Sequence, residues 1–275
     1  MSKIVVLGKS GMLGRYVYSY LKNMNENVQG TTRDILDATQ DPNITCKWID
    51  DNCEPGDIIV NCIGIITQKI DVFNDDTSMV ITVNSLFPHI IAEYCRPKQI
   101  KFIHITTDCV FSGKEGNYSE LHAHDSTELY GMSKSLGEPM SATVIRTSII
   151  GEETNTNYSL LSWLLSQNII ANGYTNHFWN GVTCLELAKI IHSMIQRNKF
   201  WIGVRHIFSG EHVSKYELLK IIANVYHKDI EILPKKVYGT CDRTLTTAHR
   251  EGIIVSKSLK DQTMEMKDYS KYLLS

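Results

Sequence analysis

Residues 4 to 14 read Ile4-Val5-Val6-Leu7-Gly8-Lys9-Ser10-Gly11-Met12-Leu13-Gly14, a short apolar run followed by a glycine-rich turn. The run predicts a buried strand, and the residues after the turn predict a helix. Glycine is needed where the backbone turns tightly or touches a pyrophosphate without an intervening Cβ. The helix N-terminus then offers unpaired N–H groups and partial positive charge to phosphates. The spacing G-x-x-G-x-x-G differs from the dinucleotide fingerprint G-x-G-x-x-G, so a plain strand-to-helix turn is the alternative interpretation.

The sequence that follows continues this pattern of strands and helices. Strand-like runs at 4–7, 28–31, 58–63, 102–106 and 143–145 alternate with helical patterns at 13–21, 79–95 and 130–140. This alternation predicts an α/β fold with a doubly wound parallel sheet. The glycine turn follows the first strand of that sheet, which favours a dinucleotide site.

The pattern becomes less regular from about residue 151. Helical runs at 160–166, 185–196 and 215–227 are separated by strand-like pieces at 206–209 and 230–233. We expect a nucleotide-binding domain over 1–150 and a smaller α/β substrate-binding region over 151–275. That region should be partly interleaved with the first sheet and cover a cleft at the strand carboxyl ends. The polar tail after Arg250 suggests a loosely ordered end.

Composition narrows the function classes. Hydrophobic residues make up 43% of the 275 residues and charged residues 21%, as in ordinary globular proteins. A net charge of −2 argues against nucleic acid or an anionic membrane as partner. The apolar run at 4–8 is too short for a signal peptide or membrane span. The seven cysteines are scattered without a C-x-x-C pair, so we expect no metal site, no disulfide framework and a cytoplasmic location.

The end of the second strand bears on the choice of cofactor. An acidic residue there would bind the ribose 2′-OH of NAD, whereas an arginine would bind the 2′-phosphate of NADP. Thr32 and Arg33 come first, which favours NADP. Asp34 follows and could cap the next segment or pair with Arg33, and a solvated surface arginine is the alternative.

Reactive side chains cluster in the sequence between 107 and 134. Tyr130 and Lys134 stand four residues apart and therefore share one helix face. A neighbouring ammonium favours the phenolate, so such a tyrosine can act as a proton donor near neutral pH. Thr107 ends the predicted strand at 101–107, where its hydroxyl could hold a carbonyl and the phenol in one network. These groups indicate a nicotinamide-dependent reductase, in which hydride reaches carbon and a proton reaches oxygen.

Several motifs together resemble the extended short-chain dehydrogenase/reductases, most closely the dTDP-4-dehydrorhamnose reductases. The motifs are the glycine turn, Thr106–Gly113, Tyr130-Gly-Met-Ser-Lys134, Val60-Asn61, Asn84, Arg146-Thr147-Ser148 and Asn180-Gly-Val-Thr183, which cover roughly residues 1–260. The resemblance implies a Rossmann fold, NADPH as cofactor, a nucleotide-linked 4-keto-6-deoxyhexose as substrate and a homodimer. It implies that Thr107 polarises the ketone, Tyr130 donates the proton, and Lys134 tunes Tyr130 and binds the ribose.

The resemblance also implies sets of binding residues. The cofactor set is Gly8, Ser10, Gly11, Met12, Leu13, Gly14, Thr32, Arg33, Cys62, Ile63, Gly64, Tyr130 and Lys134. The substrate set is Thr107, Asn84, Arg146, Asn180 and Arg243. Asn84 has a second interpretation, as a residue that orders water behind Lys134 or packs against a strand. For both arginines a surface position is the alternative.

Cys109 departs from the plain reductases, which usually carry a bulky aromatic residue there. A cysteine at this place resembles GDP-fucose synthase and the plant rhamnose synthases, which epimerise before they reduce. His177 stands where the fucose synthases have the histidine partner. The pair would catalyse 3- or 3,5-epimerisation, with a thiolate removing a proton made acidic by the C4 ketone. The alternatives are an inert Cys109 in a plain ketoreductase, and a non-catalytic NADP-binding subunit like the methionine adenosyltransferase regulatory subunit.

Overall fold

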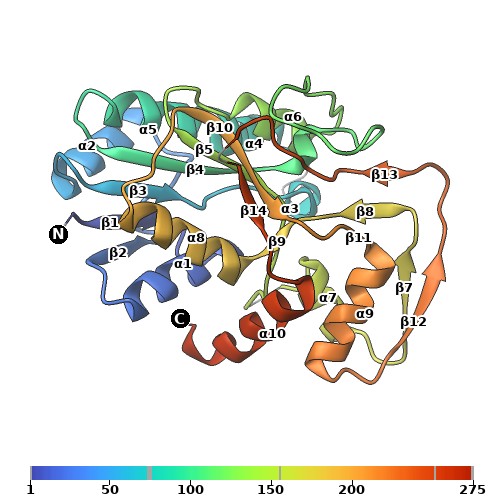
Figure 1. Ribbon diagram of the computed structural model, residues 1–275. Helices are drawn as coiled ribbons and strands as arrows, with labels where there is room; N and C mark the ends of the chain where they lie inside the picture. The colour runs from blue at the N-terminus through green and yellow to red at the C-terminus, as the bar shows by residue number, and fades with distance from the viewer. Residues whose placement is uncertain (1, 73–75, 155, 251, 274–275) are drawn as a thin grey trace.

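A central parallel sheet organises the molecule (Figure 1). The computed structural model describes residues 2–72, 76–154, 156–250 and 252–273. The sheet has seven strands in the order β14-β10-β5-β4-β3-β1-β2. Their bounds are β14 Ile253–Val255, β10 Gly203–Ser209, β5 Thr143–Thr147, β4 Lys101–Thr107, β3 Ile58–Asn61, β1 Ile4–Leu7 and β2 Val28–Thr31. Every neighbouring pair is parallel, which confirms the predicted doubly wound fold.

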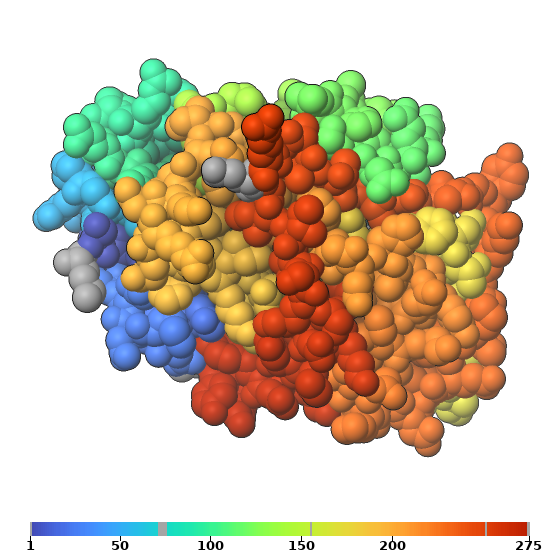
Figure 2. Space-filling model, viewed as in Figure 1, coloured from blue at the N-terminus to red at the C-terminus, as the bar shows by residue number. Residues whose placement is uncertain are grey.

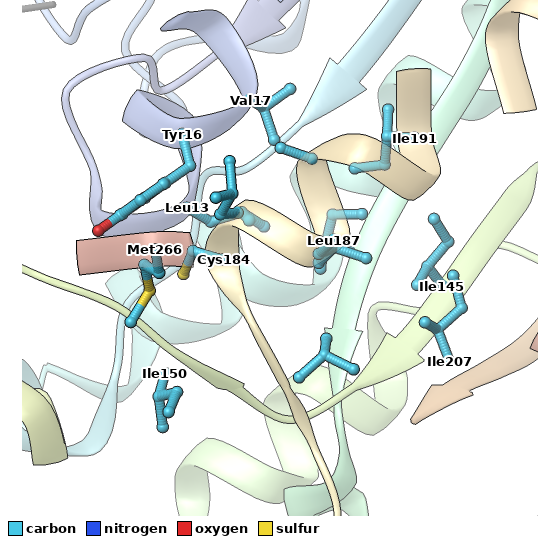
Figure 3. Close-up of a cluster of buried hydrophobic side chains, with 14 of the residues drawn as sticks. Leu13, Tyr16, Val17, Ile145, Ile150, Cys184, Leu187, Ile191, Ile207 and Met266 are labelled. Atoms are coloured by element: carbon cyan, nitrogen blue, oxygen red, sulfur yellow. The ribbon is translucent and has the colours of Figure 1, made fainter. Parts of the chain in front are cut away.

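Helices cover both faces of this sheet because successive strand residues point to opposite sides. Ile4 and Val6 lie in one apolar cluster, with α1 (Met12–Asn23) and α8 (Cys184–Gln196). Val5 and Leu7 lie in the other, with α2 (Pro42–Asn52), α4 (Thr77–Ile81), the π-helical turn η1 (Thr82–Leu86) and α5 (Phe87–Cys95). Figure 3 shows part of the first cluster, with Leu13, Tyr16, Val17, Ile145, Leu187, Ile191, Ile207 and Met266 among its labelled residues.

The connections at the strand carboxyl ends carry short helices. They are α3 (Thr67–Val72) after β3, the 3-10 turn η2 (Asp108–Val110) after β4, and α6 (Leu129–Leu136) before β5. These are the positions at which an open α/β sheet places its ligand-binding groups.

The chain beyond β5 forms small sheets and four further helices. Parallel pairs are β7 (Ile170–Tyr174) with β12 (Glu231–Lys235), and β6 (Ile149–Ile150) with β9 (Val182–Thr183). A three-stranded sheet has the order β11-β8-β13 (Val213–Ser214, His177–Trp179, Cys241–Asp242). Besides α8, the helices are α7 (Leu160–Ser166), α9 (Lys215–Tyr226), α10 (Leu259–Tyr269) and the short η3 (Ser270–Tyr272). β10 and β14 follow residue 150 in the chain but belong to the central sheet, so the two predicted regions share that sheet. The domain boundary at residue 150 stays a prediction.

The expectation of a loosely ordered tail is wrong for the segment after 256. Ser258 caps α10 by accepting a hydrogen bond from the backbone N–H of Asp261, and Leu259 and Met266 are fully buried. Figure 2 shows this C-terminal segment in red, running across one face of the molecule between α8 and α9. In the part of the chain that the structure describes, no helix is long and apolar enough to span a bilayer.

Candidate active site

The glycine turn has the geometry that its sequence requires. Gly8 has φ +76°, the left-handed region that favours glycine. A Cβ on Gly14 would lie 2.1 Å from the carbonyl oxygen of Gly8, so only glycine lets α1 approach the turn this closely. Gly11 is the N-cap of α1 and makes no side-chain capping bond, which leaves first-turn N–H groups for a ligand.

A groove in two adjoining sections runs from this turn along the carboxyl ends of the strands. The first section, about 230 Å³, is lined by Gly8, Ser10, Thr32 and Arg33 among others. The second, about 380 Å³, is lined by Met12, Leu13, Thr107, Cys109, Tyr130 and Lys134 among others. Both sections share Gly11, Cys62, Ile63, Gly64 and Lys69. The structure thus brings the predicted cofactor set to one groove, except Gly14, which packs against the backbone of Gly8.

Arg33 stands at the outer end of the first section. Its Nε donates to the Asp37 carboxylate at 2.8 Å, and its side chain is 66% exposed. The ion-pair partner of Arg33 is therefore Asp37 and not Asp34. The Asp34 carboxylate accepts a hydrogen bond from the Thr32 hydroxyl.

The loop after β3 is held from below by two buried amides. The Asn61 side-chain oxygen accepts from the Ile63 N–H at 3.0 Å. Asn84 Oδ1 accepts from the Ile65 N–H at 2.8 Å, and its Nδ2 donates to the Ile65 carbonyl and to Ser133 Oγ. Asn84 is fully buried with this amide already engaged, so the predicted substrate contact is corrected to a role in positioning the loop.

Thr107, Tyr130 and Lys134 stand together in the second section. Burial raises the pKa of the Tyr130 phenol well above its usual range, and a hydrogen bond with Thr107 opposes the shift. Burial lowers the pKa of Lys134 to about 8, while the charge of Glu138 acts in the opposite direction. Lys134 Nζ donates to the Ile105 carbonyl at 3.2 Å. The cation that most affects Tyr130 is Arg243, which the sequence had not linked to it.

Cys109 lies beside this group and is a thiol at neutral pH. Burial raises its pKa to about 12, and the Asp108 charge acts in the same direction. The sulfur accepts a hydrogen bond from Arg243 Nη1 at 3.6 Å and donates one to Asp108 Oδ1 at 3.7 Å. His177, on β8, packs its ring against Tyr174, and no contact between His177 and Cys109 is among the interactions of the described residues.

Arg146 and Asn180 correct two further predictions. Arg146 is 2% exposed and forms two hydrogen bonds to the Glu138 carboxylate and one each to His206 and His124. Asn180 is buried, and its amide exchanges two hydrogen bonds with the backbone of Leu245, both at 2.8 Å. Both side chains have their polar atoms satisfied inside the fold, so neither binds substrate here. Arg243, in contrast, lies next to the cleft, because its Nη1 donates a hydrogen bond to the sulfur of Cys109, a residue that lines the second section.

Two charged residues at the site were missed from the sequence. Asp108 is 5% exposed and lines the second section. Lys215, the first residue of α9, interacts electrostatically with Asp108 and Cys109. A Ser-x-x-Glu capping box at 214–217 marks the start of α9. The position of α9 beside the cleft depends on the pairing of strands β11, β8 and β13. This pairing joins distant parts of the chain, so no local sequence pattern predicts it. Across the described residues, no group of three metal-ligating side chains is found.

The fold and this cleft define an extended short-chain dehydrogenase/reductase. The chain belongs to the RmlD substrate binding domain family, whose profile matches residues 2–250. It is 26% identical over 226 residues to a dTDP-4-keto-6-deoxy-D-glucose reductase of Streptomyces niveus, covering 79% of this chain and 76% of the relative.

Two other similarities are informative. Methionine adenosyltransferase 2 subunit beta of Danio rerio is 25% identical over 258 residues, with 82% of this chain and 74% of that protein covered. The structure of dTDP-4-dehydrorhamnose reductase from Bacillus anthracis, solved with NADP, superposes with a TM-score of 0.82. That match covers 98% of this chain and 100% of the other at 18% identity, which establishes the shared fold.

Proposed function

We propose that the protein is an NADPH-dependent reductase of the C4 ketone of a nucleotide-linked 4-keto-6-deoxyhexose, in deoxysugar biosynthesis. The observation that carries this proposal is the meeting of Thr107, Tyr130 and Lys134 in the groove section that adjoins the glycine turn. The S. niveus relative reduces a sugar of this class by its name, which supports the substrate class. A homodimer and a cytoplasmic location stay predictions from the sequence.

The groove fits NADPH. Gly8, Gly11 and the uncapped start of α1 suit a pyrophosphate. Thr32 and Arg33, at the far end of the first section, would hold the 2′-phosphate. Cys62, Ile63 and Gly64 line both sections, where the cofactor would pass from one to the other. When bound, NADPH supplies the hydride.

The residues of the second section supply the proton. Tyr130 breaks its O–H bond and gives the proton to the C4 oxygen as that oxygen gains negative charge. Because burial raises the pKa of Tyr130, the phenol keeps its proton until a strong base forms beside it. Lys134, with a pKa of about 8, is mostly ammonium at neutral pH. The cation that acts on Tyr130 is Arg243, which would stabilise the phenolate left behind.

The sugar nucleotide would lie against the outer wall of the second section. Glu153, Tyr158 and Ser159 line that wall, from the segment between β6 and α7. Glu153 also accepts a hydrogen bond from the Ser159 N–H at 2.7 Å. Arg243 and Lys215 provide positive charge near Cys109 and are the candidates for contacts with anionic substrate atoms.

Epimerisation at C3, or at C3 and C5, is a second activity that one observation favours. The Cys109 sulfur lies on the cleft wall next to the cation Arg243. A thiolate there could remove a proton from the carbon beside the ketone, and a proton returned to the opposite face of the resulting enolate would invert that centre. Burial, and after it the neighbouring Asp108 charge, raise the pKa of Cys109 and oppose thiolate formation, which is why reduction is the leading proposal and epimerisation the addition.

One experiment tests these proposals together. NADPH and NADH oxidation would be followed with UDP-, dTDP- and GDP-linked 4-keto-6-deoxy sugars, with product NMR in deuterated water. We expect NADPH consumption, and a loss of about 100-fold or more in kcat for Tyr130→Phe. Deuterium at C3 or C5 that disappears in Cys109→Ser, with reduction retained, would support epimerisation. No consumption with any sugar would sink the reductase proposal and favour a binding subunit like the D. rerio relative.

A further inference from the structure

Lys69 lines the junction between the two sections of the groove and has no part in the reaction proposed above. It lies on α3, and its side chain is exposed. Of the five described residues that both sections share, Lys69 is the one with a charge. The other four are Gly11, at the start of α1, and Cys62, Ile63 and Gly64, in the loop after β3. A ligand that extends from one section into the other therefore has to pass Lys69.

The fold holds α3 beside the glycine turn through residues on both sides of Lys69. The loop after β3 lies directly against the turn, because a Cβ on Gly8 would stand 2.9 Å from Ile63 Cγ1. Ile65 and Ile70 are 7% and 5% exposed and belong to the apolar cluster on the α5 face of the sheet. Buried neighbours thus fix the backbone of Lys69 in the groove wall, while its long side chain stays in solvent.

The other cations near the groove are already engaged. Arg33, Lys69 and Lys134 are the cations that line the two sections within the described part of the chain. Arg33 is held in an ion pair at the outer end, and Lys134 donates to a strand carbonyl. Lys9 belongs to the glycine turn, but its Nζ lies over the ring of Tyr18, 5.3 Å from the centroid. For the Lys69 ammonium group, no partner is among the interactions of the described residues.

A pyrophosphate is the anion that this junction suits. The first N–H groups of α1 offer it partial positive charge, and a lysine ammonium adds a full charge with three donors. We propose that Lys69 binds the pyrophosphate of the nicotinamide cofactor from the α3 side of the junction. This inference rests on the proposed function and deepens it by separating the two anionic parts of NADPH. Lys69 serves the pyrophosphate, which NADH shares, and Arg33 serves the 2′-phosphate, which NADH lacks.

Equilibrium binding of three probes to the wild-type protein and its variants tests this assignment. The probes are NADPH, NADH and 2′-AMP, which has the 2′-phosphate but no pyrophosphate. In Lys69→Met we expect the Kd values for NADPH and NADH to rise by the same factor, about 5- to 20-fold, because one charge-assisted hydrogen bond is lost. The Kd for 2′-AMP should stay within about 2-fold of the wild-type value. Nicotinamide fluorescence reports NADPH and NADH, and 2′-AMP is measured by its displacement of NADPH.

Three further variants separate the pyrophosphate contact from other effects of charge. Arg33→Met should show the complementary pattern, with weaker binding of NADPH and 2′-AMP and unchanged binding of NADH. Lys69→Arg keeps the positive charge and should recover most of the affinity that Lys69→Met loses. Lys47→Met is the matched control for the loss of one charge, because Lys47 is an exposed lysine on α2 that lines neither section. Its Kd values should equal those of the wild type.

Unchanged Kd values for NADPH and NADH in Lys69→Met would overturn the assignment, and so would an equal rise in Lys47→Met. A rise for NADPH and 2′-AMP but not for NADH would also overturn it, since Lys69 would then bind the 2′-phosphate.

Sugar turnover distinguishes failure of this inference from failure of the proposed function. If the expected binding pattern appears but the wild type reduces none of the UDP-, dTDP- and GDP-linked sugars, Lys69 keeps its role and the reductase proposal fails. If the wild type reduces a sugar with NADPH and Lys69→Met binds both dinucleotides normally, only the role of Lys69 fails. A wild-type protein that binds neither dinucleotide would overturn both.

Discussion

Lys134 is a buried ammonium, and its burial has a consequence for stability. Its pKa falls from the ordinary 10.5 to about 8 in the folded protein. In the unfolded chain lysine regains the ordinary value, so between these two pH values the unfolded chain binds more protons. The free energy of unfolding should therefore rise with pH across that window, by about 2 kcal/mol between pH 8 and 9.5.

Urea denaturation at pH 8 and 9.5 checks this expectation. Lys134→Met should lose the rise, because the variant has no amine to titrate at this position. Lys22→Met, which removes an exposed lysine at the end of α1, should keep it. An identical pH dependence in Lys134→Met and wild type would contradict the assignment.

Individual residues of the site also differ in whether the sequence could predict their place. Thr107, Tyr130 and Lys134 were predictable because a strand end and a four-residue helical spacing place them by local geometry. Arg146 was not, because its partners at 124, 138 and 206 lie in three separate segments, 22, 8 and 60 residues away in the chain. A sequence shows that an arginine follows a strand pattern, but not how many acceptors surround it once it is buried.

At the scale of elements, the turn from β1 to α1 depends on a contact that only Gly14 permits. A Cβ there would lie 2.1 Å from the Gly8 oxygen and 2.8 Å from the Gly8 carbonyl carbon, both backbone atoms. Since no side chain can rotate away, Gly14→Ala must move α1 off the turn. We expect the free energy of unfolding to fall by about 3 kcal/mol, at the upper end of overpacking costs.

Gly11→Ala is the matched variant in the same turn. Its Cβ would meet the Gly8 oxygen at 3.4 Å, an ordinary contact, so the cost should stay below about 1 kcal/mol. Urea denaturation without ligand measures both. Equal costs for the two variants would mean that the turn adapts, and that Gly14 is not needed for packing.

The last helix shows where element prediction failed and why. Residues 259–269 are mostly polar, and their composition suggested a loose tail. The helical signals were sparse but present: a Ser258 cap, and Leu259 and Met266 seven residues apart on the buried side. The segment is ordered by packing against α8 and α9, and such tertiary contacts are absent from a local pattern.

At the scale of the whole molecule, the two predicted halves share one core. The apolar cluster on the α1 face joins Tyr16 and Ile145 from the first half to Leu187 and Ile207 from the second. In the sheet, β5 lies between β4 and β10, and the residues of β10 come after the predicted boundary at 150. The alternation in residues 1–150 predicted the first five strands, but the two that complete the sheet lie among less regular sequence.

This shared core leads to an expectation about a fragment of residues 1–150. Without the later chain, β5 becomes an edge strand with unpaired backbone groups, and the cluster around Tyr16 and Ile145 loses its cover from α8. We expect this fragment to show no cooperative urea transition by circular dichroism, whereas the full chain should unfold in one step.

A second measurement follows the first half within the full chain. Trp48 is the only tryptophan in residues 1–150. In a variant with Trp163, Trp179 and Trp201 replaced by phenylalanine, tryptophan fluorescence therefore reports the unfolding of that half. Its transition should coincide with that of the whole protein. A fragment with its own sharp transition, or an earlier Trp48 transition in the full chain, would instead make residues 1–150 an independent domain.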